Sequence, residues 1–330
     1  MLEVENRIES IAAGFRAAQV LLTANRLGIF ECIEKKIRTV DALAEELQAD
    51  SRGIRILLDA LCALEILQKT KNGYCNTDLA RRHLVAGAPE PKNSILLHNA
   101  GLYERWGKLY DVVRSGKPSA REVMSPDLSG DEVRFAQAME NAALPVARIA
   151  VERLPLPGAR SLLDIGGGPG VYACEFAARN PRMRVTIMDN EKTVAYARER
   201  IQAFEVRDRI DYRIGDALTD DLGGPYDCIF LSNVIHSYSP AENLLLVSRC
   251  AGSLSSGGCV VLKDFFLDSD RTAPAWTTLF AINMLVHTAS GDCYTEDEAR
   301  GWLTQAGLDP QPQIIVDPFS RMVVGAKAAG

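Results

Sequence analysis

The second half of the sequence alternates short apolar runs with amphipathic helical segments, and this pattern restricts the possible folds more than any other feature. Helical segments such as GVYACEFAARN and SPAENLLLVSRCAGSL lie between the runs. The runs themselves are RSLLDIG, RVTIMD, IDYRIGD, YDCIFLSNVI and GGCVVLKDFF. Strands that alternate with helices predict a doubly wound parallel sheet, an α/β fold. Ligands bind such sheets at the carboxyl ends of the strands, so the chemistry is expected there.

The first half of the chain has a different, mainly helical pattern. Apolar residues approximate a 3.6-residue period over 8–22, and two short helical segments follow, TVDALAEEL and a longer one from Ser51. Asn72-Gly73 predicts a tight hairpin turn after them. Two short helices followed by a hairpin indicate a winged helix. We therefore expect a winged-helix-like domain over 1–100, and over 101–330 a helical connector followed by the α/β domain.

A winged helix often binds DNA, so a transcription regulator is an alternative function. A DNA-reading helix carries several basic and amide side chains. Here Arg52 and Arg55 are offset by Asp59 and Glu65 within a largely apolar helix. The net charge of −6 and the pI near 5.4 also leave no excess positive field to attract phosphates. Packing or dimerisation is therefore the favoured use of this domain, and no nucleic-acid partner is expected.

The composition and the cysteine pattern argue against several other classes. The eight cysteines are scattered singly, with no CxxC pair, so the sequence suggests neither a zinc site nor a redox pair. No apolar run approaches the length needed to span a bilayer. The N-terminal stretch MLEVENRIES is acidic and amphipathic, unlike a signal peptide. We expect a cytoplasmic protein with no metal and no membrane partner.

A glycine-rich loop, DIGGGPG, follows the first strand of the predicted sheet and opens its first helix. Dinucleotide binding needs G-x-G-x-x-G; Gly166 and Gly168 fit, but the last position is Val171. The pattern D-x-G-x-G-x-G instead resembles motif I of S-adenosylmethionine-dependent methyltransferases. Asp189 ends the second strand, where a ribose diol is bound. Asp216 ends the third strand, near where the adenine amino group would lie. Together these elements predict S-adenosylmethionine as the cofactor.

With these motifs in place, nearly the whole chain resembles one family, the O-methyltransferases with an N-terminal winged-helix dimerisation domain. Plant caffeate and flavonoid methyltransferases, acetylserotonin methyltransferase and bacterial polyketide methyltransferases belong to it. The resemblance implies a Rossmann-like cofactor-binding catalytic domain, a homodimer, and O-methylation of a hydroxyl on an aromatic or polyketide-like small molecule. C-methylation, a family member that binds the cofactor without methyl transfer, and a winged-helix regulator that senses the cofactor stay open as alternatives.

The family carries a His-Asp-Trp motif after its fourth strand, and the His of this motif is the general base. The segment IFLSNVIHSYSP matches in place, which puts His236 at the base position and Tyr238 where the Trp stands. A histidine with an unperturbed pKa of about 6.5 suits deprotonation of a phenol or enol at neutral pH. Asp264 ends the next strand, as the family's acid does, and can fix the imidazole tautomer. The alternative for His236 is a structural loop residue.

Three positions depart from the family pattern. Cys293 stands where the family has its second acid, and Asp264 is shorter than the usual Glu. Ser232 stands four residues before His236, where a lysine near the cofactor is usual. The base therefore has less support than in the family, and this keeps the alternatives above open.

The resemblance also assigns residues to the two ligand sites. Phe135 and Met139 are spaced i, i+4 and can share one helical face, although a plain core role is the alternative. Met284 and Thr288 form a second pair with this spacing. The expected cofactor-binding residues are Asp164, Gly166, Gly168, Asp189, Asp216, Ala217 and Ser232. The expected substrate-binding residues are Phe135, Met139, Tyr238, Met284 and Thr288.

Overall fold

The structure is a computed structural model that describes residues 2–36, 38–120 and 132–330. Contacts within the chain divide it into two compact units, one of residues 2–104 and one that contains the described residues from 105 onward. Helix α7 (Asn93–Trp106) runs across this division and across the boundary expected after residue 100. The expected domain boundary therefore stays a prediction, and each unit is described by itself.

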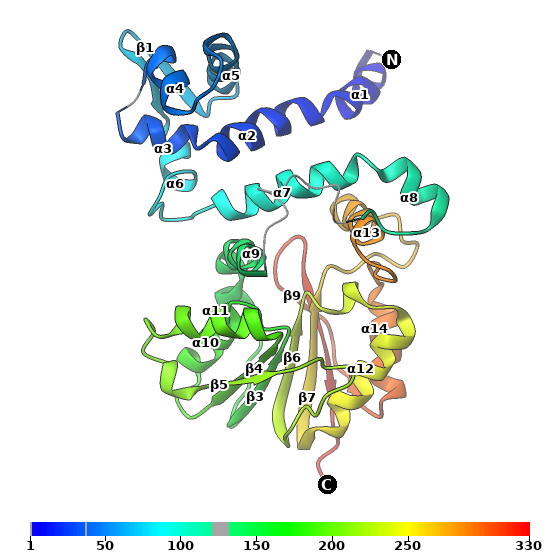
Figure 1. The fold of residues 1–330 in the computed structure, drawn as a ribbon. Coiled ribbons are helices and arrows are strands. Elements are labelled where there is room, and N and C mark those ends of the chain that lie inside the picture. Colours follow the sequence, from blue (N-terminus) through cyan, green and yellow to red (C-terminus); the bar gives the residue numbers. More distant parts are fainter. Residues whose placement is uncertain (1, 37, 121–131) are drawn as a thin grey trace. The chain divides into compact units, whose positions relative to one another are not determined.

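The first unit is helical with one two-stranded hairpin (Figure 1). The side chain of Thr39 caps α4 and that of Asp50 caps α5, so both helices begin where a short polar side chain accepts a backbone N–H. Strand β1 pairs with β2 in antiparallel register, and since Thr70 pairs with Gly73, the hairpin turn is Lys71-Asn72, one residue before the predicted Asn72-Gly73. The elements are α1 (Leu2–Ala13), α2 (Phe15–Leu27), α3 (Ile29–Glu34), α4 (Val40–Glu46), α5 (Ser51–Ala63), β1 (Leu67–Thr70), β2 (Gly73–Asn76) and α6 (Asp78–His83).

The second unit is built on one mixed sheet with the order β5-β4-β3-β6-β7-β10-β8, in which β9 also pairs with β10. Strands β3 to β7 are mutually parallel, and β10 adds to the edge of β7 in antiparallel orientation. The predicted doubly wound sheet is confirmed, with this antiparallel addition. The strands are β3 (Ser161–Ile165), β4 (Arg184–Asp189), β5 (Ile210–Ile214), β6 (Tyr226–Ser232), β7 (Leu254–Asp264), β8 (Asp309–Pro310), β9 (Ile314–Ile315) and β10 (Arg321–Ala326).

Helices cover both faces of this sheet, as the alternation of strands and helices requires (Figure 1). Residues of α9, α10 and α11 form one buried apolar cluster with one face, and residues of α12 and α14 form a second cluster with the other. None of the helices in the described ranges is both long and apolar enough to cross a membrane. The helices are α8 (Leu109–Ser115), α9 (Glu132–Arg153), α10 (Val171–Arg179), α11 (Glu191–Ile201), α12 (Pro240–Gly252), α13 (Ala275–His287) and α14 (Glu296–Gln305).

Two capping boxes fix the segments that follow the sheet's carboxyl ends. Ser239 and Glu242 cap the start of α12, with Pro240 at its first position. Thr295 and Glu298 cap α14 in the same way. The single turn of 3₁₀ helix at Ile235–Ser237 therefore lies between the end of β6 and a helix whose first residue is well determined.

Candidate active site

The glycine loop makes a tight turn between β3 and α10. Gly168 has φ +53° and donates its backbone N–H to Asp189 Oδ2 at 3.0 Å. Gly170, with φ +75°, is the N-cap of α10, and a Cβ there would lie 2.6 Å from Ile201 Cδ1. Glycine is favoured at both positions because the backbone is left-handed, and at Gly170 a Cβ would also displace the Ile201 side chain. The loop therefore presents bare backbone at the carboxyl end of the sheet.

Two of the predicted cofactor carboxylates lie at the ends of adjacent strands. Asp189 ends β4, and its Oδ1 accepts hydrogen bonds from the backbone and side chain of Asn190. Asp216 is exposed just after β5, where its Oδ1 accepts from Leu218 N at 2.9 Å. Strands β4 and β5 are paired, so both carboxylates stand on the same edge of the sheet.

The other predicted cofactor residues are less exposed. Asp164 is buried in β3 under the glycine loop, and its Oδ2 has no hydrogen-bond partner among the described residues. Burial, together with the nearby Asp189 carboxylate, raises the pKa of Asp164 to about 8. Ala217 is buried, and its carbonyl accepts from Arg249 Nε at 2.9 Å. Ser232 is half-buried at the end of β6. The sequence could show their positions in the motifs but not their burial.

His236 and Asp264 are in direct contact. The Nδ1 atom of His236 lies 2.8 Å from Asp264 Oδ1, and the side chains are 11 % and 2 % exposed. The same carboxylate oxygen accepts the backbone N–H of Phe265 at 2.8 Å, which orients the carboxylate. Because Nδ1–H donates to Asp264, the neutral imidazole keeps its lone pair on Nε2. This is the arrangement that a general base needs.

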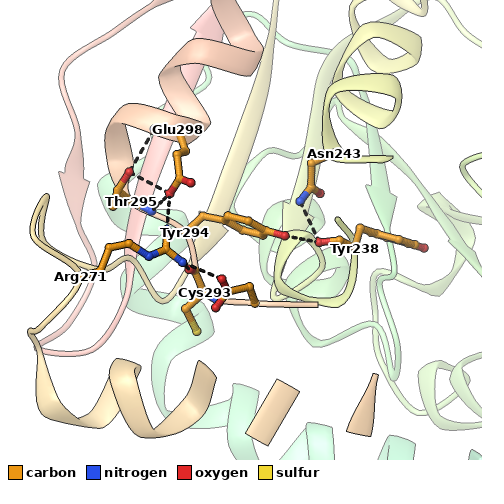
Figure 2. A network of polar contacts seen from close by, with 8 residues as sticks. Tyr238, Asn243, Arg271, Cys293, Tyr294, Thr295 and Glu298 are labelled. Atoms are coloured by element: carbon orange, nitrogen blue, oxygen red, sulfur yellow. Dashed lines mark hydrogen bonds and ion pairs between the residues drawn. The ribbon is translucent and has the colours of Figure 1, made fainter. Parts of the chain in front are cut away.

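The segment that carries His236 is held at its backbone carbonyls, and Figure 2 shows the bonds to the carbonyl of Tyr238. Asn243 Nδ2 donates to Tyr238 O at 3.3 Å, and the Tyr294 hydroxyl donates to the same carbonyl. Asp292 donates its backbone N–H to His236 O at 3.0 Å. Residues of α12 and of the segment before α14 thus fix the main chain on both sides of the imidazole.

Arg271 joins the segment before α14 to that helix. As Figure 2 shows, its guanidinium bonds Glu298 at 2.9 Å and the carbonyl of Cys293 at 2.9 Å, and it also bonds Asp292 at 2.6 Å. Burial raises the pKa of the Cys293 thiol, and the nearby Asp264 carboxylate adds to this. Where the family has a second acid, this chain therefore places a neutral, fully buried thiol near Asp264.

An aromatic cluster borders His236, and sequence reasoning missed it. The Phe280 ring lies edge-on to the imidazole at 5.0 Å between centroids. Phe265 meets Phe280 at 5.0 Å, and Trp276 stacks on Phe280 at 5.3 Å. Trp276 is 41 % exposed. The i, i+4 spacing of Trp276 and Phe280 in α13 was the available signal.

The predicted substrate residues do not all gather at His236. Tyr238 follows it on the same segment and is half-buried. Phe135 and Met139 lie on α9, the first 51 % exposed and the second partly buried. Met284 is buried in α13, whereas Thr288 lies just past the end of that helix. The Thr288 hydroxyl donates to Met284 O at 2.8 Å, so the two side chains do not form the expected helical pair.

No cluster of three or more His, Cys, Asp or Glu side chains in the described ranges is arranged to hold a metal ion. Comparison with known proteins gives a consistent result. An O-methyltransferase domain model matches residues 106–309, and an O-methyltransferase dimerisation domain model matches residues 9–86.

Relatives of known activity match over most of their length. A 3-hydroxy-5-methyl-1-naphthoate 3-O-methyltransferase of Streptomyces sahachiroi is 29 % identical, over 91 % of this chain and 88 % of its own. The acetylserotonin O-methyltransferase of Bos taurus is 30 % identical over 91 % of both chains. The structure of human N-acetylserotonin methyltransferase in complex with SAM superposes with a TM-score of 0.87 at 27 % identity, covering 99 % of this chain and 98 % of that one.

Proposed function

We propose that this chain, which belongs to the O-methyltransferase family, methylates a hydroxyl of an aromatic small molecule and uses His236 as the general base. The protein is an S-adenosylmethionine-dependent enzyme. The observation that carries the proposal is the contact of 2.8 Å between buried His236 and buried Asp264 at the carboxyl ends of adjacent strands.

The residues present fit the cofactor. The glycine loop lets a ligand approach the backbone without meeting a Cβ, Asp189 suits a ribose diol, and Asp216 suits an adenine amino group. Asp164 supports the loop from below, and Ala217 and Ser232 complete the edge of the site. Bound S-adenosylmethionine supplies an electrophilic methyl group on its sulfonium. The protein's contribution is to hold two reactants in line, which can supply much of the rate.

His236 takes the proton from the substrate hydroxyl. Its Nε2 carries the lone pair because Nδ1–H donates to Asp264, and the carboxylate stabilises the imidazolium that results. The hydrogen bonds to the carbonyls of His236 and Tyr238 keep the imidazole from turning away. With Cys293 neutral, Asp264 is the acid that supports the base.

The aromatic cluster supports an aromatic substrate. Phe265, Trp276 and Phe280 offer ring faces and edges beside the imidazole, and aromatic pairs gain about 0.5–1.5 kcal/mol beyond area burial. The matched relatives act, by their names, on a hydroxynaphthoate and on acetylserotonin, both aromatic. C-methylation and a regulatory role are not favoured, because the matched relatives are named O-methyltransferases.

Replacement of His236 tests the proposal. His236→Ala should lower kcat for a phenol of high pKa by about 10²–10⁴-fold, the usual range for general base catalysis, and leave S-adenosylhomocysteine affinity nearly intact. The loss should shrink for a phenol that is already ionised at the assay pH. The matched control is His83→Ala, since His83 lies in the other unit against Glu90 O. Wild-type turnover in the His236 variant would refute the proposal.

We also propose that the protein is a homodimer formed through its dimerisation domain. Helices α4 and α5 followed by the β1–β2 hairpin support a winged helix, and the dimerisation domain model that matches residues 9–86 supports association as its role. Ile8, Ile11 and Phe15 are 71 %, 72 % and 51 % exposed on the first two helices, an apolar surface suited to a second copy of the chain. Sedimentation of the intact protein as a monomer at micromolar concentration would contradict this.

We further propose that the protein acts in the cytoplasm. All eight cysteines are free thiols in the structure, as expected in a reducing compartment. The test is localisation of the tagged protein in the cells that produce it, and a membrane or secreted fraction would count against the proposal.

A further inference from the structure

Lys263 is a buried lysine to which the sequence analysis gave no role. It lies near the end of β7 and is 2 % exposed. Its Nζ donates to Asn233 Oδ1 at 2.9 Å and stands 5.6 Å from the ring centroid of Tyr172 and 5.7 Å from that of Phe265. An ammonium has three N–H groups, and a single acceptor among the described residues leaves donors for another ligand.

Burial makes the charged form of Lys263 unfavourable in the protein without a ligand. Burial lowers the pKa of Lys263 to about 8, although the carboxylates of Asp264 and Asp317 favour its charged form. Among the described residues neither carboxylate makes an ion pair with Lys263. Two aromatic rings and one amide oxygen therefore stabilise its charge. A buried cation without an anionic partner is unusual for a purely structural residue.

The register of the sheet relates Lys263 to a departure from the family pattern. Lys263 is the direct partner of Ser232 across the parallel pair of β6 and β7. Partners in register point to the same face of the sheet. The Tyr172 ring that the lysine faces also has Ser232 close to its hydroxyl. The lysine expected at position 232 is therefore absent, and a lysine stands at the adjacent position one strand away.

The order of the strands places this lysine beyond the glycine loop. Asp216 follows β5, Asp189 ends β4, the glycine loop follows β3, and Ser232 and Lys263 lie at the ends of β6 and β7. Val234, just past β6, touches the loop, since its Cγ2 would lie 2.8 Å from a Cβ on Gly166. With the nucleoside end of the cofactor at the two aspartates, its amino-acid end would extend toward β6 and β7. That end carries an α-carboxylate.

We propose that Lys263 supplies, from the neighbouring strand, the cation that the family carries at position 232, and that its ammonium binds the α-carboxylate of the cofactor. The inference rests on the proposed placement of the cofactor. A carboxylate would accept hydrogen bonds from the N–H groups of Lys263 that do not bond Asn233. A charge-assisted hydrogen bond in a site with little water is strong. Tyr172 and Phe265 hold the cation in place until the ligand arrives.

The test compares two ligands that share a nucleoside. S-adenosylhomocysteine has the amino-acid end, and 5′-methylthioadenosine lacks it. By calorimetry, Lys263→Met should raise the Kd for S-adenosylhomocysteine about 10- to 100-fold and change that for 5′-methylthioadenosine less than about 2-fold. The control is Lys327→Met, since Lys327 Nζ binds the carbonyls of Ala251 and Leu254 at the other end of β7. This control should change neither affinity.

A second variant keeps the test decisive if the first is poorly folded. Exchange of the two residues, Ser232→Lys with Lys263→Ser, should restore S-adenosylhomocysteine affinity to within about 3-fold of wild type, because the cation returns to the same face. Equal loss for both ligands, or no loss for either, would overturn the proposal. If Asp189→Ala leaves the affinity for 5′-methylthioadenosine unchanged, the cofactor placement is wrong, and the role of Lys263 fails with it.

Discussion

Gly291→Ala should show how tightly the His236 segment is held. Gly291 precedes Asp292, whose backbone N–H bonds His236 O. A Cβ on Gly291 would lie 2.4 Å from His236 O and 2.6 Å from Thr288 Oγ1, whereas real Cβ contacts essentially never fall below 3.0 Å. The carbonyl of His236 must therefore retreat by about 0.6 Å, the difference between 3.0 and 2.4 Å.

This displacement should affect turnover more than cofactor binding. A misplacement of about 1 Å can cost about 10²-fold in rate, so we expect kcat to fall about 10- to 100-fold. Overpacking should lower the free energy of unfolding by about 1–3 kcal/mol. The affinity for S-adenosylhomocysteine should change less than about 2-fold, because the glycine loop and Asp189 follow other strands.

Methylation kinetics measure kcat, calorimetry measures the affinity for S-adenosylhomocysteine, and thermal unfolding measures the change in stability. The matched control is Gly301→Ala in α14, where the nearest atom to the new Cβ is Gln305 Nε2 at 4.0 Å. It should keep full activity and gain up to about 1 kcal/mol in stability, as alanine does in a helix interior. Wild-type kcat and stability in Gly291→Ala would refute the reasoning. They would mean that the segment around Gly291 shifts to admit the Cβ without displacing His236.

Three further variants test other parts of the site. Asp189→Ala should weaken S-adenosylhomocysteine binding by about 1.5–3 kcal/mol, and unchanged calorimetry would remove Asp189 from the site. Tyr294→Phe removes the donor to Tyr238 O, so kcat should fall severalfold and the free energy of unfolding by about 1 kcal/mol; wild-type kcat would show that this bond does not position the base. Burial raises the pKa of Asp164 from 3.8 to about 8, so its contribution to stability is present at low pH and is lost as pH rises toward 8. In urea unfolding, the free energy of unfolding of Asp164→Asn should therefore rise relative to that of wild type by up to about 1.4 kcal/mol per pH unit between pH 5 and 7. A constant difference between the two proteins over this pH range would contradict this.

The sequence predicted the parts of the fold that depend on local patterns. The alternation of strands and helices, the turns of the glycine loop and the capping box at Ser239 all depend on residues close together in the chain, and each is found in the structure. The contact between His236 and Asp264 also followed from their places at the ends of adjacent strands.

Contacts that depend on register or on distant segments could not be predicted. The pairing of Ser232 with Lys263 needs the offset between two strands, which no local pattern contains. Thr288 has the spacing of a helical partner of Met284, but the helix ends at His287 and the hydroxyl bonds the backbone instead. The bonds from Arg271 join its loop to a second loop at Asp292 and to α14 at Glu298, so neither partner marks the other in the sequence.

The exposure of Trp276 makes the aromatic cluster optically readable. The indole stacks on Phe280, which contacts His236, and 41 % of Trp276 is open to solvent. The chain has two other tryptophans, of which Trp302 is buried and Trp106 is bonded to Asn283. Replacement of both by phenylalanine would leave Trp276 as the sole tryptophan emitter. A ligand that covers this face would shift its fluorescence to shorter wavelength, so aromatic acceptors could be ranked by emission with S-adenosylhomocysteine bound, before any methylated product is known.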